Sequence, residues 1–417
     1  PGFSLFRRSD SFTANPTAQG VSLRGLGPSG ASRSLVLLDG IPLNDPFGGW
    51  VSWSKVPRES LSRVEIVRGG GATAWGNAAL GGVIQLLTEA APPTGTGRLA
   101  ASYGDFATRS IELVANQRVG PGNLQLSGRA FATNGFLLVA PEDRGPVDVA
   151  AWSRHHWLAA RWRQSVGDRG SLTVSGRAFR ETRGNGTTYQ RNASAEDSLS
   201  IALDVAASRT FSWTALAYGQ DQTFSSTFSS VNATRTSETP ASDQFDVPAA
   251  ALGAAWTGVW VETNGARTSA GVDFRGVRGE TRENFTFSAG DFTRQRIAGG
   301  AQEFVGAFAL HERPLAEMWR LTVGARLDGW RERDGHRREQ DGASGASLRD
   351  DHYADRDGVE FSPSAGLLWS PAPGWRLRLA GQQAFRRPTL NELYRPFRVG
   401  SVITEANAAL KTERVTS

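Results

Sequence analysis

The stretch Val64–Thr88 reads VEIVRGGGATAWGNAALGGVIQLLT. Two short apolar segments flank a glycine-dense turn and a run of small residues, a pattern that predicts two strands joined by a tight connection. From Gly97 onward the chain changes character and becomes one long series of alternating strands. A compact glycine-rich unit ahead of such an array of strands suggests a β-barrel whose interior is occupied.

Two domains are predicted, residues 1–92 and residues 93–417. The linker between them, residues 90–95, contains prolines that cannot join a strand ladder. The first domain is expected to hold a helical turn and four strands, at Arg58–Leu61, Gln19–Arg24, Ser34–Leu38, Arg63–Arg68 and Gly82–Thr88.

The second domain is predicted to contain about thirteen antiparallel strands. Short connections follow the even-numbered strands, and long polar connections follow most of the odd-numbered ones. Short turns on one rim and long loops on the other are typical of outer-membrane barrels. The strands are expected at 97–104, 108–119, 122–133, 153–166, 170–182, 197–209, 211–223, 243–262, 266–284, 297–312, 318–334, 358–371 and 374–386.

The faces of these strands alternate in polarity. In the segment 374–386, Leu377 and Leu379 fall on one face, whereas Arg376 and Arg378 fall on the other. A soluble β-sandwich would alternate too, with its apolar face inward. Runs of roughly 10 to 18 residues exceed the usual length of globular strands and suit tilted strands that cross a bilayer.

Composition excludes several classes of protein. There are no cysteines, so disulfides, thiolate nucleophiles and cysteine metal sites are ruled out. The net charge is +5 and only Lys55 and Lys411 are lysines, but the arginines are scattered along the strands, which argues against a nucleic-acid footprint. A mean hydropathy of −0.34 does not argue against a membrane barrel, whose strands are apolar on alternate residues only.

No motif supports catalysis or a bound cofactor. Gly25–Gly30 matches G-x-G-x-x-G but leads into an apolar strand where a nucleotide site needs a helix, so we interpret it as a loop. Asp39 and Gly40 suit a tight turn. The histidines form no ligand triad, and the acidic run 350–357 lacks the EF-hand glycine and terminal glutamate, which favours a solvated loop. No metal site is predicted.

Five segments, taken in order, resemble the TonB-dependent outer-membrane receptors. They are distributed from Pro1 to Glu413 and so span nearly the whole chain, and their order makes the resemblance specific. Gly70-Gly71, Trp75 and Thr412 stand where many members carry Gly-Pro, tyrosine and proline. The segments are Pro1-Gly2-Phe3, Val21–Gly25, Val36–Asn44, Val64–Thr88, and Phe385–Tyr394 with Asn407–Glu413.

The resemblance implies an all-β membrane barrel with an N-terminal α+β plug domain in its lumen. The family's barrel has 22 strands, of which about 13 to 14 are expected here. A chain truncated at both ends is therefore expected, with the TonB box before Pro1 and further strands after Ser417. The implied protein is a monomer in outer-membrane lipid that works with TonB. The plug motif residues are Asp39, Gly40, Gly69, Gly76, Gly81 and Gly82.

In this family, plug arginines pair with barrel glutamates and lock the plug. By motif match, the plug candidates are Arg24 and Arg68, and the barrel candidates are Glu392 and Glu413. The alternative for both glutamates is solvated loop charge, because exposed ion pairs contribute little.

The plug apex is expected at 27–31 and 45–53. Its candidate ligand-binding residues are Phe47, Trp50, Trp53 and Arg33, because aromatic faces with arginine suit a flat anionic or metal-chelating ligand. The alternative is packing of the plug against the barrel wall, which we favour for Trp53.

The implied function is energised import of a scarce metal chelate, foremost a ferric siderophore. Cobalamin and oligosaccharide import are the alternatives within the family. A plugless porin or adhesin and a soluble β-rich carbohydrate-binding protein or hydrolase are the alternatives from other classes.

Overall fold

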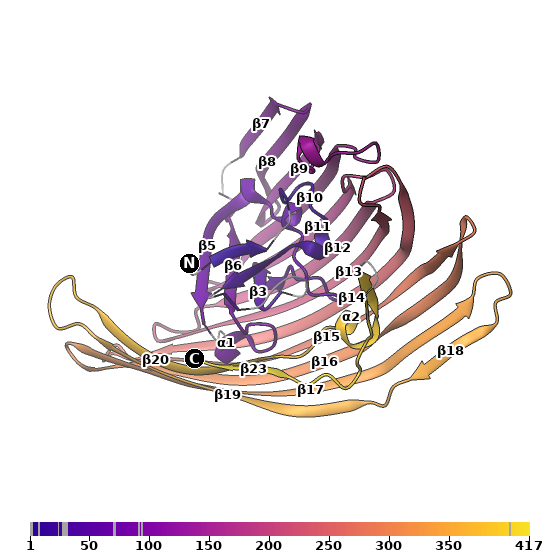
Figure 1. Ribbon diagram of the computed structural model, residues 1–417. Coiled ribbons are helices and arrows are strands. Elements are labelled where there is room, and N and C mark those ends of the chain that lie inside the picture. Colours follow the sequence, from indigo (N-terminus) through magenta and orange to yellow (C-terminus); the bar gives the residue numbers. More distant parts are fainter. Residues whose placement is uncertain are drawn as a thin grey trace.

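The computed structural model describes residues 3–6, 9–23, 25–26, 32–69, 72–90, 92, 95–399 and 402–417 (Figure 1). Most of these residues lie in β-strands. No helix among them is long and apolar enough to cross a membrane.

The elements of the first domain are β1 (Phe3–Phe6), η1 (Pro16–Ala18), β2 (Gly20–Leu23), β3 (Ser34–Leu38), β4 (Ile41–Pro42), η2 (Trp53–Lys55), η3 (Arg58–Ser60), β5 (Leu61–Arg68), α1 (Ala72–Trp75) and β6 (Gly82–Thr88). Those of the second are β7 (Thr96–Gly104), β8 (Thr108–Val119), β9 (Gly122–Phe136), η4 (Pro141–Asp143), β10 (Ala151–Val166), β11 (Gly170–Gly184), β12 (Arg191–Val205), β13 (Phe211–Val231), β14 (Glu238–Val261), β15 (Arg267–Ser288), β16 (Asp291–Ala316), β17 (Trp319–Asp341), β18 (Ser347–His352), β19 (Arg356–Trp369), β20 (Leu377–Arg386), α2 (Leu390–Tyr394), β21 (Phe397–Val399), β22 (Val402–Thr404) and β23 (Glu413–Thr416).

Fifteen strands of the second domain form one antiparallel sheet, and β21 and β22 pair separately. Its order runs from β23 through β20 and β19 back to β7 without a crossover, and β18 pairs with β17. The sheet curves into a trough, and the first domain lies on its concave side (Figure 1). β7 and β23 are the two edges, so within the described residues the sheet is open. The fold class predicted from the sequence is confirmed.

The thirteen predicted strands correspond to β7–β17, β19 and β20, but most of them extend further toward the long loops. The connection expected at 224–242 shrinks to 232–237, for example. The sixth strand is the clearest correction, because it spans Arg191–Val205 and not 197–209. In the added part of this strand, residues 191–196, the side chains are only small or polar, so alternation of large apolar residues does not mark the strand there.

The convex face carries an apolar belt. Leu158, Leu199 and Leu379 are among its exposed side chains, at 61%, 63% and 75% exposure. Aromatic rings gather on this face near the short turns, where Phe211 stacks on Trp260 with ring centroids 4.7 Å apart and Trp319 on Trp369 at 5.4 Å. An apolar band edged by aromatic residues is typical of a sheet that faces lipid.

The stretch that opened the sequence analysis forms β5, α1 and β6. β6 is an inner strand of a four-stranded sheet of order β4-β3-β6-β5, parallel to β3 and antiparallel to β5. Its apolar side chains pack with those of β2 and β3, including Val36, Leu23 and Ile84. The predicted boundary at residue 92 falls between the end of β6 and the start of β7.

Candidate functional site: the plug against the barrel wall

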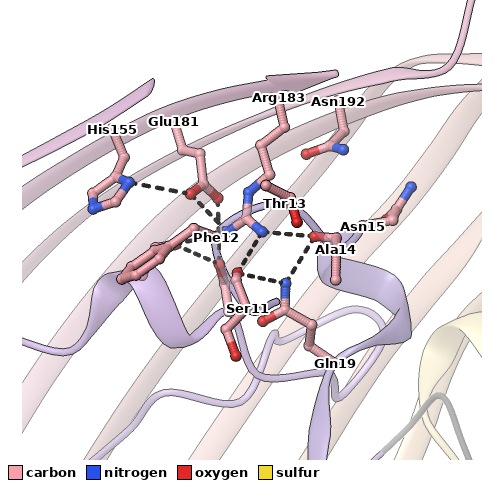
Figure 2. A network of polar contacts seen from close by, with 12 residues as sticks. Ser11, Phe12, Thr13, Ala14, Asn15, Gln19, His155, Glu181, Arg183 and Asn192 are labelled. Carbon is pink, nitrogen blue, oxygen red and sulfur yellow. Dashed lines mark hydrogen bonds and ion pairs between the residues drawn. The ribbon is translucent and has the colours of Figure 1, made fainter. Parts of the chain in front are cut away.

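Arg183 on β11 is buried where the first domain meets the concave face of the large sheet (Figure 2). One guanidinium nitrogen donates to the backbone carbonyls of Ser11 and Ala14, at 2.7 and 2.6 Å. The second terminal nitrogen of the guanidinium donates to the Ser54 hydroxyl at 2.9 Å and to the Glu181 carboxylate at 2.6 Å. One buried cation therefore joins three points of the plug to a carboxylate of the wall.

Other polar groups hold the same plug loop. The side-chain amide of Gln19 donates to the two carbonyls that Arg183 binds. Asn185 in the wall donates to the carbonyl of Thr13 at 3.1 Å, and Asn15 in the plug donates to Ser226 at 3.2 Å. We call residues 10–15 with their wall partners the polar clamp.

An aromatic stack closes one side of the polar clamp. The ring of Phe12 lies 4.6 Å from that of Phe131 and 5.6 Å from that of His155, both on wall strands. The Arg129 guanidinium lies over both phenylalanine rings, at 5.5 and 5.1 Å. Stacked rings and a cation–π contact add a packed component to the hydrogen bonds.

Lys55 supplies a second buried contact. Its ammonium lies 2.6 Å from Glu196 and 3.0 Å from the amide oxygen of Gln222. Arg177 binds the same glutamate and also donates to the backbone carbonyl of Lys55. Burying a charge costs several kcal/mol unless it is paired, and here each buried charge has a partner.

Asp45 lies close to this ion pair. One oxygen accepts from the backbone N–H groups of Phe47 and Gly48, at 2.9 and 2.7 Å, and the other accepts from Gln222. Burial raises the pKa of Asp45 above its ordinary value, and Lys55 and these hydrogen bonds offset only part of that rise. The Asp45 carboxyl therefore shapes the 45–50 turn and ties it to the wall.

The two predicted barrel glutamates meet at a third contact. Glu413 binds Arg33 of the plug with two hydrogen bonds, at 2.8 and 3.0 Å, and binds Arg386 of β20 at 2.5 Å. Arg386 also binds Glu392, whose carboxylate accepts from Thr389 in the capping box of α2. Burial raises the pKa of Glu392, but Arg386 and the Thr389 hydrogen bonds together hold it below its usual range.

The plug side of this contact is Arg33, which we had expected to bind ligand. Arg24, the first predicted plug arginine, lies outside the described residues. Arg68 is exposed on β5, where its backbone pairs with Gly82 of β6, and its side chain makes no hydrogen bond or ion pair with the residues that the structure describes. The locking roles of Arg24 and Arg68 remain predictions.

The predicted apex aromatics lie under α2. Phe47 is completely buried and Trp50 nearly so, and the Trp50 ring lies 5.5 Å from Phe224 on β13. The backbone N–H of Asn391 in α2 donates to the carbonyl of Phe47. Trp53 packs against the plug's own core, whereas the packing interpretation had placed it against the barrel wall. We call Phe47 and Trp50 with the wall and α2 the apolar contact.

Two plug motif glycines stand where a side chain would collide. A Cβ at Gly76 would lie 2.7 Å from the Arg326 guanidinium in the wall, and one at Gly82 would lie 2.2 Å from the carbonyl oxygen of Val67. Both also have positive φ, at 64° and 135°. Small size at these positions lets the plug approach the wall and lets β6 approach β5.

The remaining motif residues form turns. The Asp39 carboxylate accepts from the backbone N–H and hydroxyl of Thr88, at 3.0 and 2.7 Å, which joins the 39–40 turn to the end of β6. In α1, the Thr73 hydroxyl lies 3.0 Å from that of Ser364 on β19, so this part of the stretch also touches the wall. The other motif glycines are Gly40, in the 39–40 turn, and Gly69 and Gly81, which lie at the two ends of the connection between β5 and β6.

Sequence reasoning missed Arg183, Glu181 and Glu196. They are single polar residues among many on the concave strand face, and nothing in their spacing distinguishes them. Lys55 carried the one usable signal, because a chain with 46 basic residues has only two lysines.

A plug seated on the concave face of a long antiparallel sheet, whose convex face is apolar, defines an outer-membrane barrel with an internal plug. Comparison with known protein families agrees with this architecture. The family model "TonB dependent receptor-like, beta-barrel" matches residues 130–417, and the family model "TonB-dependent Receptor Plug Domain" matches residues 1–83. The chain belongs to the TonB-dependent receptor family, whose barrels lie in the outer membrane.

Curated relatives match over short segments. The ferric enterobactin receptor of Pseudomonas aeruginosa is 32% identical over 124 residues, covering 27% of this chain and 16% of the relative. The ferrienterobactin receptor of Escherichia coli K12 is 35% identical over 101 residues, covering 21% and 13%. The vitamin B12 transporter BtuB of Vibrio cholerae is 29% identical over 90 residues, covering 22% and 15%.

Solved structures match over nearly the whole chain. The copper transporter OprC superposes with a TM-score of 0.75 at 18% identity, covering 100% of this chain and 64% of its own. The ferric yersiniabactin uptake receptor FyuA from Yersinia pestis gives 0.73 at 12% identity, covering 93% and 60%. The chain thus spans less than two thirds of these proteins, and the likeness shows the shared fold.

Proposed function

We propose that this chain supplies the plug and part of the barrel of a receptor that imports a ferric siderophore across the outer membrane. TonB is the proposed energising partner, as the family implies. The observation that carries the proposal is the seating of the plug, which meets the wall through separate contacts at Arg183, Lys55 and Arg33.

These contacts suit a gate. Hydrogen bonds and ion pairs exchanged for water contribute modestly in net terms, so the plug can leave the wall at a limited cost. The plug keeps its own apolar core, built from β2, β3 and β6, when those contacts break. A pull on the plug can therefore separate it from the wall without first dissolving that core.

The cargo is proposed from the relatives. Two of the curated relatives are named as receptors for ferric enterobactin, and the structural relative FyuA takes up ferric yersiniabactin. A ferric siderophore is the cargo class that most of these names share, whereas BtuB and OprC carry vitamin B12 and copper.

Ligand contacts at Phe47, Trp50, Trp53 and Arg33 remain part of the proposal. Phe47 and Trp50 are covered by α2 and the wall, so a ligand reaches them only after α2 lifts. Arg33 is partly exposed beside Glu413, so an anionic ligand could compete with that carboxylate.

Uptake assays test this function. The full-length receptor that contains this chain is produced in cells without other siderophore receptors, and uptake of radioactive iron is measured with a ferric catecholate siderophore. We expect saturable uptake that stops when TonB is deleted. Uptake that is unchanged without TonB, or high-affinity binding of cobalamin with none of the ferric siderophore, would overturn the proposal.

A further inference from the structure

The side chain of His155, on the wall strand β10, is completely buried under the plug (Figure 2). Its direct neighbours on the two adjacent strands are Phe131 and Glu181. Neither ring nitrogen has a hydrogen-bond partner among the residues that the structure describes. Nδ1 lies 3.8 Å from the Glu181 carboxylate, which is too far for a hydrogen bond. A titratable group thus faces a carboxylate without bonding to it.

The plug covers this ring. Phe12 of the plug stacks on His155 with ring centroids 5.6 Å apart, and Phe131 of the wall stacks on it at 4.7 Å. The guanidinium of Arg58, also in the plug, lies 5.8 Å from the centre of the Phe12 ring. The plug therefore supplies both the apolar cover that keeps water from the imidazole and a positive charge close to it.

The charged groups around the ring disfavour a proton on it while the plug is seated. The ionisable groups whose charges act on it are Arg129, Arg183, Arg58 and His156. The facing carboxylate of Glu181 is already paired with Arg183. Two further carboxylates in this region, Glu59 and Glu112, lie beside Arg129. An enclosed imidazole that faces three guanidinium groups stays neutral, because an added charge would be both desolvated and repelled.

Departure of residues 10–15 reverses these conditions. Phe12 and Arg58 leave with the plug, so water reaches the ring and one of the repelling charges is gone. Arg183 loses its plug partners at the same time. An imidazole in water titrates at about pH 6.5, and a neighbouring carboxylate such as Glu181 favours its charged form.

We propose that His155 takes up one proton from water when residues 10–15 leave the wall, and gives it back when they return. The charged imidazole then donates to Glu181 and stabilises the vacated wall. Because the seated plug excludes this proton, release becomes more favourable as the pH falls through about 6.5 and does not depend on this group well above that pH. The inference rests on the proposed function only for the departure of the plug from the wall.

The test follows a nitroxide label on Ser9→Cys, next to residues 10–15, in the purified full-length receptor in detergent. This chain has no other cysteine. Urea below the main unfolding transition populates the released loop, and the electron paramagnetic resonance spectrum gives the ratio of mobile to immobile label. For the wild type we expect this ratio to rise about tenfold from pH 7.5 to pH 5.5, as one proton bound at about pH 6.5 requires.

His155→Phe is the test variant, because it keeps an aromatic ring between Phe12 and Phe131 but cannot take up a proton. His155→Gln, which fills less space, is a second variant that must behave in the same way. His156→Gln is the matched control, since it removes a histidine one position away that is exposed on the convex face. We expect a change of less than about twofold in both His155 variants and the wild-type rise in the control.

Three results would contradict the proposal. They are a wild-type ratio that does not change between pH 7.5 and pH 5.5, a full rise retained in both His155 variants, and a rise lost equally in His156→Gln. The measurement uses neither cargo nor TonB, so its failure would leave the uptake assay of the proposed function intact.

Discussion

The plug rests on the same sheet in two different ways. At the apolar contact, Phe47 and Trp50 exclude water under α2 and beside Phe224. At the polar clamp, Arg183 holds two backbone carbonyls of residues 10–15. Stabilisation by apolar burial is non-directional and roughly proportional to the apolar area removed from water. A buried charged network, in contrast, depends on every partner being present. The apolar contact should therefore weaken gradually as buried area is lost, whereas the polar clamp should fail when a single partner is removed.

The largest effect is expected from emptying the apolar contact. Replacing Phe47 with alanine leaves a cavity between plug and wall and should lower the free energy of unfolding by about 3–5 kcal/mol. Urea titration followed by tryptophan fluorescence measures it, with Phe361→Ala on the lipid-facing side as control. A Phe47→Ala loss no larger than that of the control would mean that the apex adds no strength to the plug.

Breaking the polar clamp should cost about 3 kcal/mol. Arg183→Leu leaves Glu181 without its cation, although Ser52 remains near that carboxylate, and removal of one partner of a buried pair is strongly destabilising. Limited proteolysis should then cut within residues 10–15. Arg180→Leu, three residues away on the convex face of the same strand, should leave this loop protected. Equal protection in both variants would contradict the clamp.

The Asp45 carboxyl predicts a pH effect at the apex. Because burial raises its pKa above the ordinary 3.8, the folded protein holds this proton more tightly than the unfolded chain. Stability from this group therefore rises as the pH falls through the raised pKa and levels off below about 3.8.

Asp45→Asn should remove that rise, a difference of at most about 1.4 kcal/mol per pH unit. Unfolding free energies of wild type and variant between pH 7 and pH 4 measure it. Asp221→Asn, exposed on the convex face of β13, is the control. If the unfolding free energies of wild type and Asp45→Asn depend on pH in the same way, the Asp45 carboxyl does not contribute to this pH dependence.

The smallest effect is expected at the partly exposed pair of Arg33 and Glu413. Arg33→Gln should cost about 0.2–1 kcal/mol at low salt, and the difference should shrink as salt screens the pair. Lys411→Gln, an exposed lysine in the same loop region, serves as control. A salt-independent difference would mean that Arg33 acts through packing and not through charge.

Much of the fold could be predicted from the sequence because the lipid-facing belt imposes strict alternation. β3 and β6 were predicted with their observed bounds. The bounds at the long-loop ends of the strands were not, since a segment such as Arg191–Asp197 carries only small or polar residues and no large apolar side chain. Short elements such as α1 and β4 carry too few residues for any periodicity.

The site was harder to predict than the fold. Motif matching identified Glu392 and Glu413, which do meet through Arg386. It proposed Arg24 and Arg68 as the plug partners, whereas Arg33, which the apex interpretation assigned to ligand binding, is the plug residue that pairs with Glu413. The role of Arg183 could not be predicted, since it depends on two backbone carbonyls of a plug loop that lie 172 and 169 residues away in the sequence.

The most direct test of the gate is a disulfide between plug and wall. The chain has no cysteines, so Thr73→Cys with Ser364→Cys, whose hydroxyls lie 3.0 Å apart, introduces a single crosslink between α1 and β19. Thr108→Cys with Thr133→Cys, with hydroxyls 2.8 Å apart, places the same bond within the wall as the control.

Uptake of the radioactive ferric siderophore is measured in whole cells under oxidising conditions and again after reduction. If the plug must part from the wall, the Thr73–Ser364 crosslink should abolish uptake, a reductant should restore it, and the Thr108–Thr133 crosslink should leave it unchanged. Full uptake through receptors whose Thr73–Ser364 disulfide is shown to be formed would contradict the account.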